Sequence, residues 1–305
     1  MNNILTIIAS PLAAIIFSPL FVGIIVKIKA LLSGRKGPPL IQQYSNIFKL
    51  LKKEIVYSKT TSSIFKIAPV VILSTTILAT CFIPLVPEKT TFQFQGDIIL
   101  MLYLLGLSRF FLILSALDTG SSFEGMGASR EAFYSALIEP IIFICLVTLM
   151  CLTKNPTISS IFDSQINSGA GMIILTIIPL FVVLLAENTR IPFDDPTTHL
   201  ELTMIHEVMI LDNSGPSLAF MEYASYIKLW LFSLIFALTI LPSFDNNILF
   251  SLILAVTMSL IAVFIGFIEF IMARVHLLKI PQLLFSAAVI ALLGFFINIT
   301  KFLTW

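Results

Sequence analysis

Charged side chains are scarce in this chain. Asp, Glu, Lys and Arg make up 11% of the 305 residues, whereas soluble domains average about 25%. Hydrophobic residues make up 58%, and the mean hydropathy is +1.02. This composition excludes an ordinary soluble domain and indicates an integral membrane protein.

A basic surplus and a cysteine motif are also missing. The net charge of +1 leaves no surplus for a nucleic-acid surface. Cys81, Cys145 and Cys151 lie in apolar runs without the CxxC spacing of a thiolate-held metal or iron–sulfur site. We expect them to pack as small apolar side chains, with no metal or other cofactor bound by this chain.

Long apolar runs dominate the sequence. A transmembrane helix needs roughly 20 mostly apolar residues, and such runs recur eight times. The first run lacks the basic segment that opens a secretory signal, so we expect it to be retained. With no internal repeat evident, we predict an all-α integral membrane protein, a single domain over residues 1–305. The predicted spans are 4–28, 67–86, 97–117, 133–153, 169–187, 226–242, 247–268 and 282–303.

The basic residues predict the orientation. Lys and Arg near span ends stay on the cytoplasmic side. With both termini outside, fourteen of the eighteen fall in inner loops, Lys89, Lys154 and Lys301 fall outside, and Arg109 lies within the third span. We expect the chain to lie in the inner, plasma membrane of a bacterial cell. The three long loops then all face the cytoplasm, and we expect the functional residues to lie on that side.

The first of these loops, about 29–66, opens with SGRKGPPLIQQY. Its Gly and Pro residues end the preceding helix, and apolar residues then recur at steps of three or four. This predicts an amphipathic surface helix that lies on the lipid headgroups, on the protein's own surface, or on both. Its candidate surface residues are Arg35, Lys36, Gln43 and Lys49.

The second loop, about 118–132, is rich in glycine, and we expect it to be pliable with Ser129 capping the fourth span. Inside that span lies Glu139, next to Pro140. A carboxylate there is costly unless paired, wetted or protonated, so it marks a proton or ion path or else a neutral, hydrogen-bonded Glu that serves packing. The candidate path residues are Glu139, Glu187, Asp118, Arg109 and Arg130, of which Arg130 could equally be a topology anchor.

The third loop begins with AENTRIPFDDPTTHLELTMIHE, residues 186–207. Asp195 followed by Pro196 predicts a helix start, which would put His199, Thr203 and His206 on one face. Metal binding is disfavoured because HExxH spacing and a third ligand are missing. A solvated or partner-facing surface and a proton-handling site both stay open. The candidate docking or coupling residues are Arg190, Asp194, Asp195, His199, Glu201, His206 and Glu207.

Three segments carry a resemblance to a known family. They are RKGPPLIQQYSNIFKLLKKE (35–54), LDTGSSFEGMGASREAFYSALIEP (117–140) and the long third loop from 186 to 230. The chain resembles the membrane subunit shared by respiratory complex I (the NuoH type) and membrane-bound nickel–iron hydrogenases, in its formate hydrogenlyase and hydrogenase-4 form. The resemblance covers nearly the whole chain and implies eight transmembrane helices, with Arg130, Glu139, Glu187 and Arg190 where complex I subunits also have Arg, Glu, Glu and Arg.

One departure from the complex I form bears on mechanism. Where that form has a run of Glu residues after Pro-Phe-Asp, this chain has DPTTHLELTMIHE. The acidic run helps to build the quinone chamber in complex I, so its loss argues against quinone here. The resemblance implies that the charges line a seam between the membrane arm and a redox module docked from the cytoplasm.

Three functions remain in view. The first is a non-catalytic anchor and coupling subunit of a hydrogenase complex, whose large and small subunits and iron–sulfur protein carry the iron–sulfur clusters and the nickel–iron centre beside antiporter-like membrane subunits. The second is a quinone-reducing subunit of a complex I-like enzyme. The third is a stand-alone ion transporter, which the crowding of charge toward one face disfavours because transporters bind near the midplane.

Overall fold

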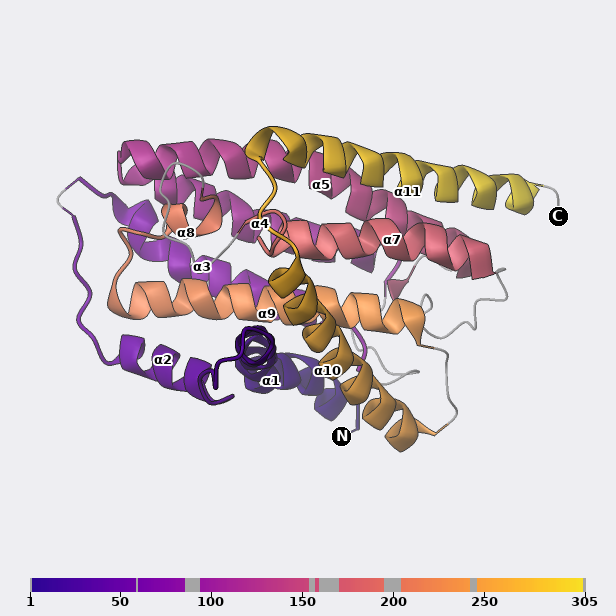
Figure 1. The fold of residues 1–305 in the computed structure, drawn as a ribbon, viewed down its shortest axis with the longest axis horizontal. Helices are drawn as coiled ribbons and strands as arrows, with labels where there is room; N and C mark the ends of the chain where they lie inside the picture. Colours follow the sequence, from indigo (N-terminus) through magenta and orange to yellow (C-terminus); the bar gives the residue numbers. More distant parts are fainter. Residues whose placement is uncertain are drawn as a thin grey trace.

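Apolar helices laid against one another build the protein, which was analysed as a computed structural model (Figure 1). The structure describes residues 2–58, 60–85, 94–153, 157–158, 170–194, 204–241 and 246–303. Within these ranges seven helices are long and apolar enough to cross a membrane, and α7 adds a shorter apolar helix. The predicted all-α membrane architecture is therefore confirmed. The eight apolar helices are α1 (Asn2–Leu32), α3 (Ser63–Thr80), α4 (Asp97–Asp118), α5 (Ser122–Thr153), α7 (Ala170–Glu187), α9 (Gly215–Ile240), α10 (Asn247–Ile271) and α11 (Ile280–Leu303).

Helix α9 forms the centre of the bundle. It contacts α1, α3, α7 and α10, and its most apolar window is 72% buried, against at most 44% in the other long helices. Those other helices keep large apolar side chains on the outside, such as Tyr103, Ile248 and Phe285. A helix that is apolar all round needs apolar surroundings on every side, which protein supplies for α9 and lipid supplies for the rest.

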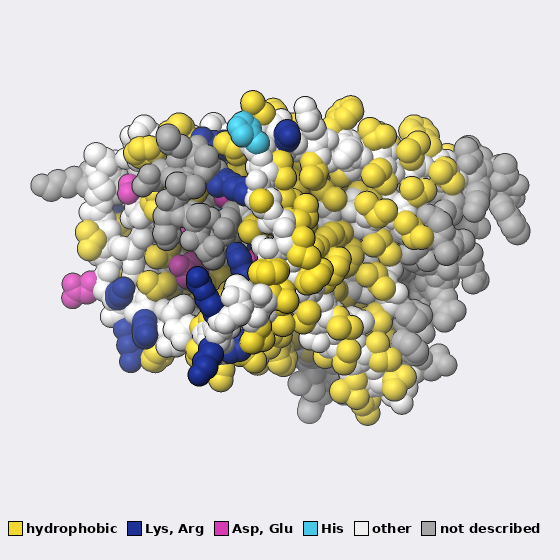
Figure 2. All heavy atoms as spheres, viewed as in Figure 1, with side chains coloured by type: hydrophobic (Ala, Val, Ile, Leu, Met, Phe, Trp, Pro, Cys, Tyr) yellow, Lys and Arg dark blue, Asp and Glu magenta, His cyan; other side chains and the backbone are white. Residues whose placement is uncertain are grey.

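Short elements and charged side chains gather at one end of the bundle, which we call the polar end. Figure 1 places α2 (Gln42–Leu51) and α8 (His206–Met209) at this end, opposite the C-terminus. Lys, Arg, Asp and Glu side chains are concentrated over the same end, whereas apolar side chains cover the spans (Figure 2). The predicted separation of charged loops from apolar spans is thus visible in the fold.

The second loop does not exist as a pliable loop. Helix α5 begins at Ser122 and runs without a break through the predicted loop, and Ser129 lies inside it with its hydroxyl donating to the Met126 carbonyl. One of its glycines serves packing instead, because a Cβ on Gly127 would collide with Val208 Cγ1 of α8. The prediction of Ser129 as a cap was wrong because hydropathy detects the apolar run and not the polar turns that precede it.

The third loop is also shorter than predicted. Helix α9 starts at Gly215, with Pro216 in its first turn, well before the apolar run that begins near residue 226. The expected helix from Asp195 through Glu207 is interrupted, because residues 204 and 205 are not helical and α8 begins only at His206. Asp195, His199 and Glu201 lie outside the described residues. The prediction of one helix face that continues as far as His206 was therefore wrong at residues 204 and 205.

The predicted amphipathic helix of the first loop is confirmed as α2, which packs on α1 and α9. Ile41, just before the helix, and Phe48 within it are 66% and 60% exposed, while the polar residues Gln43 and Asn46 turn toward the protein and line an internal cavity. The helix therefore presents apolar surface outward and amide groups inward.

Candidate functional site

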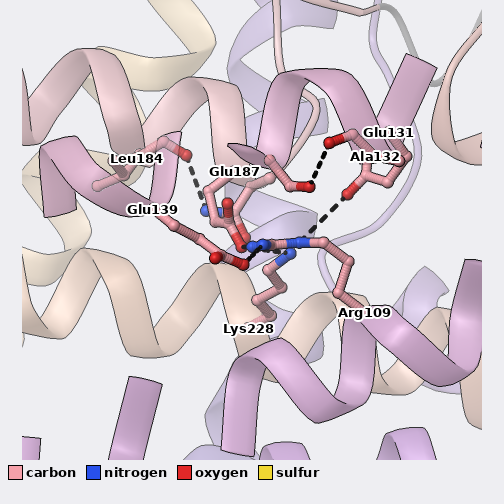
Figure 3. Close-up of polar contacts among 9 residues, drawn as sticks. Arg109, Glu131, Ala132, Glu139, Leu184, Glu187 and Lys228 are labelled. Carbon is pink, nitrogen blue, oxygen red and sulfur yellow. Dashed lines mark hydrogen bonds and ion pairs between the residues drawn. The ribbon is translucent and has the colours of Figure 1, made fainter. Parts of the chain in front are cut away.

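Arg109 is the centre of a buried ion-pair cluster. It lies on α4, nine residues from the end at Asp118, which is about 14 Å along the helix. Its two terminal nitrogens donate to Glu139 of α5 and to Glu187 at the end of α7, and its Nε lies 3.5 Å from a carboxylate oxygen of Glu131. Figure 3 shows these carboxylates converging on Arg109. Two of the candidate path residues, Glu139 and Glu187, are thus direct partners of Arg109.

A second cation completes this cluster. Lys228 of α9 places its Nζ 2.9 Å from Glu187, so four helices, α4, α5, α7 and α9, each contribute a charge. Arg109, Glu131 and Glu187 are at most 8% exposed. A buried charge is tolerated only when it is paired, and removing one partner leaves the others uncompensated. The cluster therefore ties the four helices together electrostatically.

Sequence reasoning missed Glu131 and Lys228 as members of this cluster. Glu131 fell in the supposed second loop, and Lys228 was counted only among the fourteen inner basic residues that predict the orientation. The start of α5 would have revealed Glu131. Because α5 begins at Ser122, Glu131 and Glu139 lie about two turns apart on one helix. The apolar run alone could not show this.

A second group of ion pairs lies closer to the polar end. Glu269 of α10 accepts Arg190 at 3.4 Å and faces Lys29 of α1 at 3.7 Å. Asp194 is paired with Arg274 at 2.8 Å and accepts the backbone N–H of Ile205, also at 2.8 Å. These contacts tie the chain after α7 to α1, to α10 and to the segment before α8.

Two of the candidate docking or coupling residues are buried. Arg190 is 9% exposed and Asp194 is 1% exposed, so neither side chain lies on a surface that a docked partner could reach. Arg130 likewise turns inward and donates to the Met204 carbonyl at 2.9 Å. Arg130 and Asp194 thus bind the segment that leads into α8, whereas Arg190 binds Glu269 of α10.

The α8 residues His206 and Glu207 differ in their proton affinity. Burial lowers the pKa of His206 to about 4, with Lys228 and Arg190 acting in the same direction. Burial raises the pKa of Glu207 to about 7, aided by the Glu222 and Asp194 carboxylates and opposed by Arg190. His206 is therefore neutral at pH 7, whereas Glu207 can gain or lose a proton there.

These groups surround an internal chamber of about 390 Å³ at the polar end. It lies among α1, α2, α3, α4, α8, α9, α10 and the chain that follows α7. The hydroxyl of Tyr226 donates to Gln43 at 3.1 Å and so links α9 to α2 across it. Its polar lining includes Lys29, Gln43, Asn46, Arg109, Glu187, Asn188, Arg190, His206, Glu207, Glu222, Tyr226, Lys228 and Glu269.

A second hollow of about 620 Å³ opens on the outside of the bundle between α4 and α5. Apolar residues line most of it, and the side chain of Glu139 is 57% exposed there. Arg109 and Glu187 line both this groove and the chamber. Arg109 and Glu187 thus border both the chamber and the side of the bundle.

The other candidate residues lie apart from the cluster. Asp118 accepts the backbone N–H of Ser62 at 2.7 Å, next to the start of α3. Arg35, Lys36 and Lys49 are exposed at the polar end. Among the residues that the structure describes, no group of three His, Cys, Asp or Glu side chains could hold a metal ion.

Comparisons with known proteins agree with this architecture. The sequence model of a family described as NADH dehydrogenase matches residues 4–299. Hydrogenase-4 component C of Escherichia coli is 32% identical over 77% of this chain and 74% of its own length. Formate hydrogenlyase subunit 4 of the same organism is 28% identical over 91% of this chain and 93% of its own.

A solved structure shares the fold. A chain of the membrane-bound sulfane sulfur reductase, an archaeal respiratory membrane complex, superposes with a TM-score of 0.85 at 21% identity, over 98% of this chain and 100% of that one. Together with the sequence matches, this confirms the resemblance stated from the three loop segments.

Proposed function

Since this chain belongs to the NADH dehydrogenase family, we propose that it is the membrane anchor and coupling subunit of a nickel–iron hydrogenase complex of the formate hydrogenlyase and hydrogenase-4 type. It has no catalytic centre of its own. Iron–sulfur clusters and the nickel–iron centre belong to the large and small subunits and the iron–sulfur protein of that complex. The names of the two Escherichia coli relatives favour the hydrogenase form.

One observation carries the coupling role. Arg109 and Glu187 line both the chamber at the polar end and the groove where Glu139 is exposed. A change of protonation or position in the chamber therefore acts on the same guanidinium that holds Glu139. The redox reaction at the polar end moves a proton or cation at the side of the bundle through this shared contact.

The geometry also suggests where partners bind. A carboxylate exposed to lipid is costly, so a membrane subunit of the antiporter-like type covers the groove around Glu139. The hydrogenase subunits dock on the polar end, which the excess of basic residues makes the cytoplasmic side. The chain then lies in the inner, plasma membrane with both termini outside.

Replacement of Glu139 with Gln tests the coupling role. Glu139→Gln keeps the shape and a hydrogen bond to Arg109 but removes the ionisable proton. We expect the purified complex to assemble and to evolve or consume hydrogen at near wild-type rates, while proton or cation movement in vesicles falls about tenfold or more. Glu54→Gln, at an exposed carboxylate outside the cluster, is the matched control. Normal ion movement in Glu139→Gln would leave this residue with a packing role only.

A second candidate function is quinone reduction. The chamber volume of about 390 Å³ falls in the range of small-molecule sites, and Arg190, His206 and Glu207 line it. Against quinone stands the hydrogenase-type third loop, in which Thr197, Thr198 and His199 replace acids of the complex I form.

Quinone extraction separates the two functions. We expect hydrogen turnover by the purified complex with soluble electron partners to be insensitive to quinone-site inhibitors, and solvent extracts to contain no tightly bound quinone. Stoichiometric quinone, or inhibition that is lost in Arg190→Gln, would favour the quinone-reducing function.

A further inference from the structure

An apolar groove runs between α1 and α10 near the polar end. The two helices approach each other closely at Gly266, where a Cβ would lie 3.1 Å from the Ile25 carbonyl oxygen and 3.2 Å from Ile28 Cβ. The resulting groove has a volume of about 520 Å³ and is lined by Ile28, Leu31, Leu32, Leu260, Val263, Phe264 and Phe267.

The groove is long enough to hold part of an acyl chain. On α10 its lining extends from Leu260 to Phe267, which is about 10 Å along the helix axis. On α1 it includes Leu31 and Leu32, the last two residues of that helix. An acyl chain that enters at the polar end would lie along this apolar wall.

The chain folds back sharply at the end of α1 and forms a basic hook, residues 33–37. Gly34 and Gly37 have positive φ angles, Arg35 N donates to the Ala30 carbonyl at 2.9 Å, and a Cβ on Gly37 would lie 2.6 Å from Ala30 Cβ. Lys27 Nζ closes the hook by donating to the Lys36 carbonyl at 2.6 Å. The hook is therefore held against α1 directly after the groove residues Leu31 and Leu32.

The hook carries positive charge that the chain itself does not neutralise. In the ranges that the structure describes, no carboxylate forms an ion pair with Lys27, Arg35 or Lys36. The nearby carboxylate of Glu269 is buried and faces Lys29 and Arg190 instead. Lys27 and Leu31, four residues apart, share one face of α1, so basic and apolar groups are adjacent.

We propose that this groove and the basic hook together bind one anionic phospholipid of the leaflet at the polar end. An acyl chain lies along Leu31, Val263 and Phe264, and the headgroup phosphate lies at Arg35 and Lys36. A transmembrane helix of another subunit fits less well, because helix–helix contacts in membranes use small residues and this groove is walled by Leu, Val and Phe. Only a lipid supplies both an anionic group and a thin apolar chain.

Lipid retention by the intact complex tests the site. The complex is reconstituted in nanodiscs of phosphatidylcholine with a minor fraction of phosphatidylglycerol. Native mass spectrometry then counts the phosphatidylglycerol molecules that stay bound when the complex is released from the nanodisc. The double variant Arg35→Gln with Lys36→Gln should retain it about tenfold less. The control, Lys49→Gln with Lys52→Gln, removes two basic residues of α2 and should retain it like the wild type.

A second variant tests the groove independently of charge. Val263→Trp fills the groove and should lower retention while the hook is unchanged, and a photoreactive phenylalanine analogue at Phe264 should cross-link to phosphatidylglycerol. Equal loss in the α2 control would overturn the proposal in favour of general charge attraction. Unchanged retention in both the hook and Val263→Trp variants, or cross-linking to a protein subunit, would also overturn it.

Discussion

At the scale of single residues, burial and neighbouring charge decide which groups exchange protons near neutral pH. His206 and Glu207 are adjacent on α8, yet burial moves the pKa of the imidazole to about 4 and that of the carboxyl to about 7. Burial disfavours the charged form of each group and so has opposite effects on an acid and a base. Proton handling was one of two open interpretations for His199 and His206; His206 is neutral at pH 7, whereas the adjacent Glu207 carboxyl has a pKa near 7.

Glu207→Gln should remove a pH dependence of stability. The pKa of Glu207 is about 7 in the folded protein against 4.5 normally, so the folded state binds this proton more tightly. Its contribution to the free energy of unfolding is fully present below about pH 4.5 and is lost as pH rises to about 7. We expect the melting temperature of the wild type, relative to that of Glu207→Gln, to fall as pH rises. Thermal unfolding of both proteins in detergent from pH 5 to 8 is the measurement.

His206 contributes the opposite slope, and the comparison cancels it. Its lowered pKa gives stability that is present above pH 6.5 and is lost as pH falls toward 4. Both proteins keep this residue, so its effect drops out of the difference. A wild-type-minus-variant difference that stays flat between pH 5 and 7 would show that burial and the carboxylates of Glu222 and Asp194 do not raise the pKa of Glu207.

At the scale of elements, close backbone approach positions α8 on α5. Gly127 meets Val208 Cγ1 at 2.3 Å and the Ile205 carbonyl oxygen at 3.0 Å, measured from an added Cβ. Val208 and Met209 are completely buried in a separate apolar cluster beneath α8. Packing of Val208 and Met209 therefore holds the short helix in place. The other two residues of α8, His206 and Glu207, are thereby held at the chamber.

Gly127→Ala should displace α8. The added methyl group has no room, so we expect the free energy of unfolding to fall by about 1–3 kcal/mol, as overpacking does elsewhere. Gly125→Ala is the control, because a Cβ there meets open space and Ala favours a helix. Thermal unfolding of both variants in detergent is the measurement. Equal melting temperatures for the two variants would mean that α8 does not rest on Gly127.

At the scale of the whole molecule, the polar end exposes several large apolar side chains among its charged residues. Ile41, Phe48 and Val56 are 66%, 60% and 71% exposed around α2, and Leu211 is 48% exposed after α8. Exposed apolar patches among charged residues mark interaction sites with membrane or protein. We expect soluble partner subunits to cover part of this surface.

Hydrogen exchange should detect this cover. In the assembled complex we expect slow exchange at residues 35–54 and 204–212, and faster exchange after the soluble arm is removed with the membrane part intact. Residues 250–265 of α10, in a span, are the internal control and should not change. Unchanged exchange at the polar end would remove the docking prediction and leave the lipid surface as the cover for α2.

Composition and periodicity by themselves determined the membrane class, the apolar helices and the amphipathic helix in the first loop. They did so because each property is local: a span needs only a long apolar run, and a surface helix needs only apolar residues at steps of three or four. The same local information marked Arg109, Glu139 and Glu187 as charges that need partners, since charge within an apolar run is costly wherever it lies.

Only the tertiary structure decided which charges meet. Glu131 and Lys228 join Arg109 because α5 and α9 extend beyond their apolar runs and converge with α4 and α7, and nothing local encodes that convergence. In the structure Arg190 and Asp194 are buried, and Asp118 binds the backbone N–H of Ser62 at the start of α3. Ion pairs join residues as far apart in sequence as Lys29 and Glu269, so their choice depends on how the helices pack and not on the sequence around each residue.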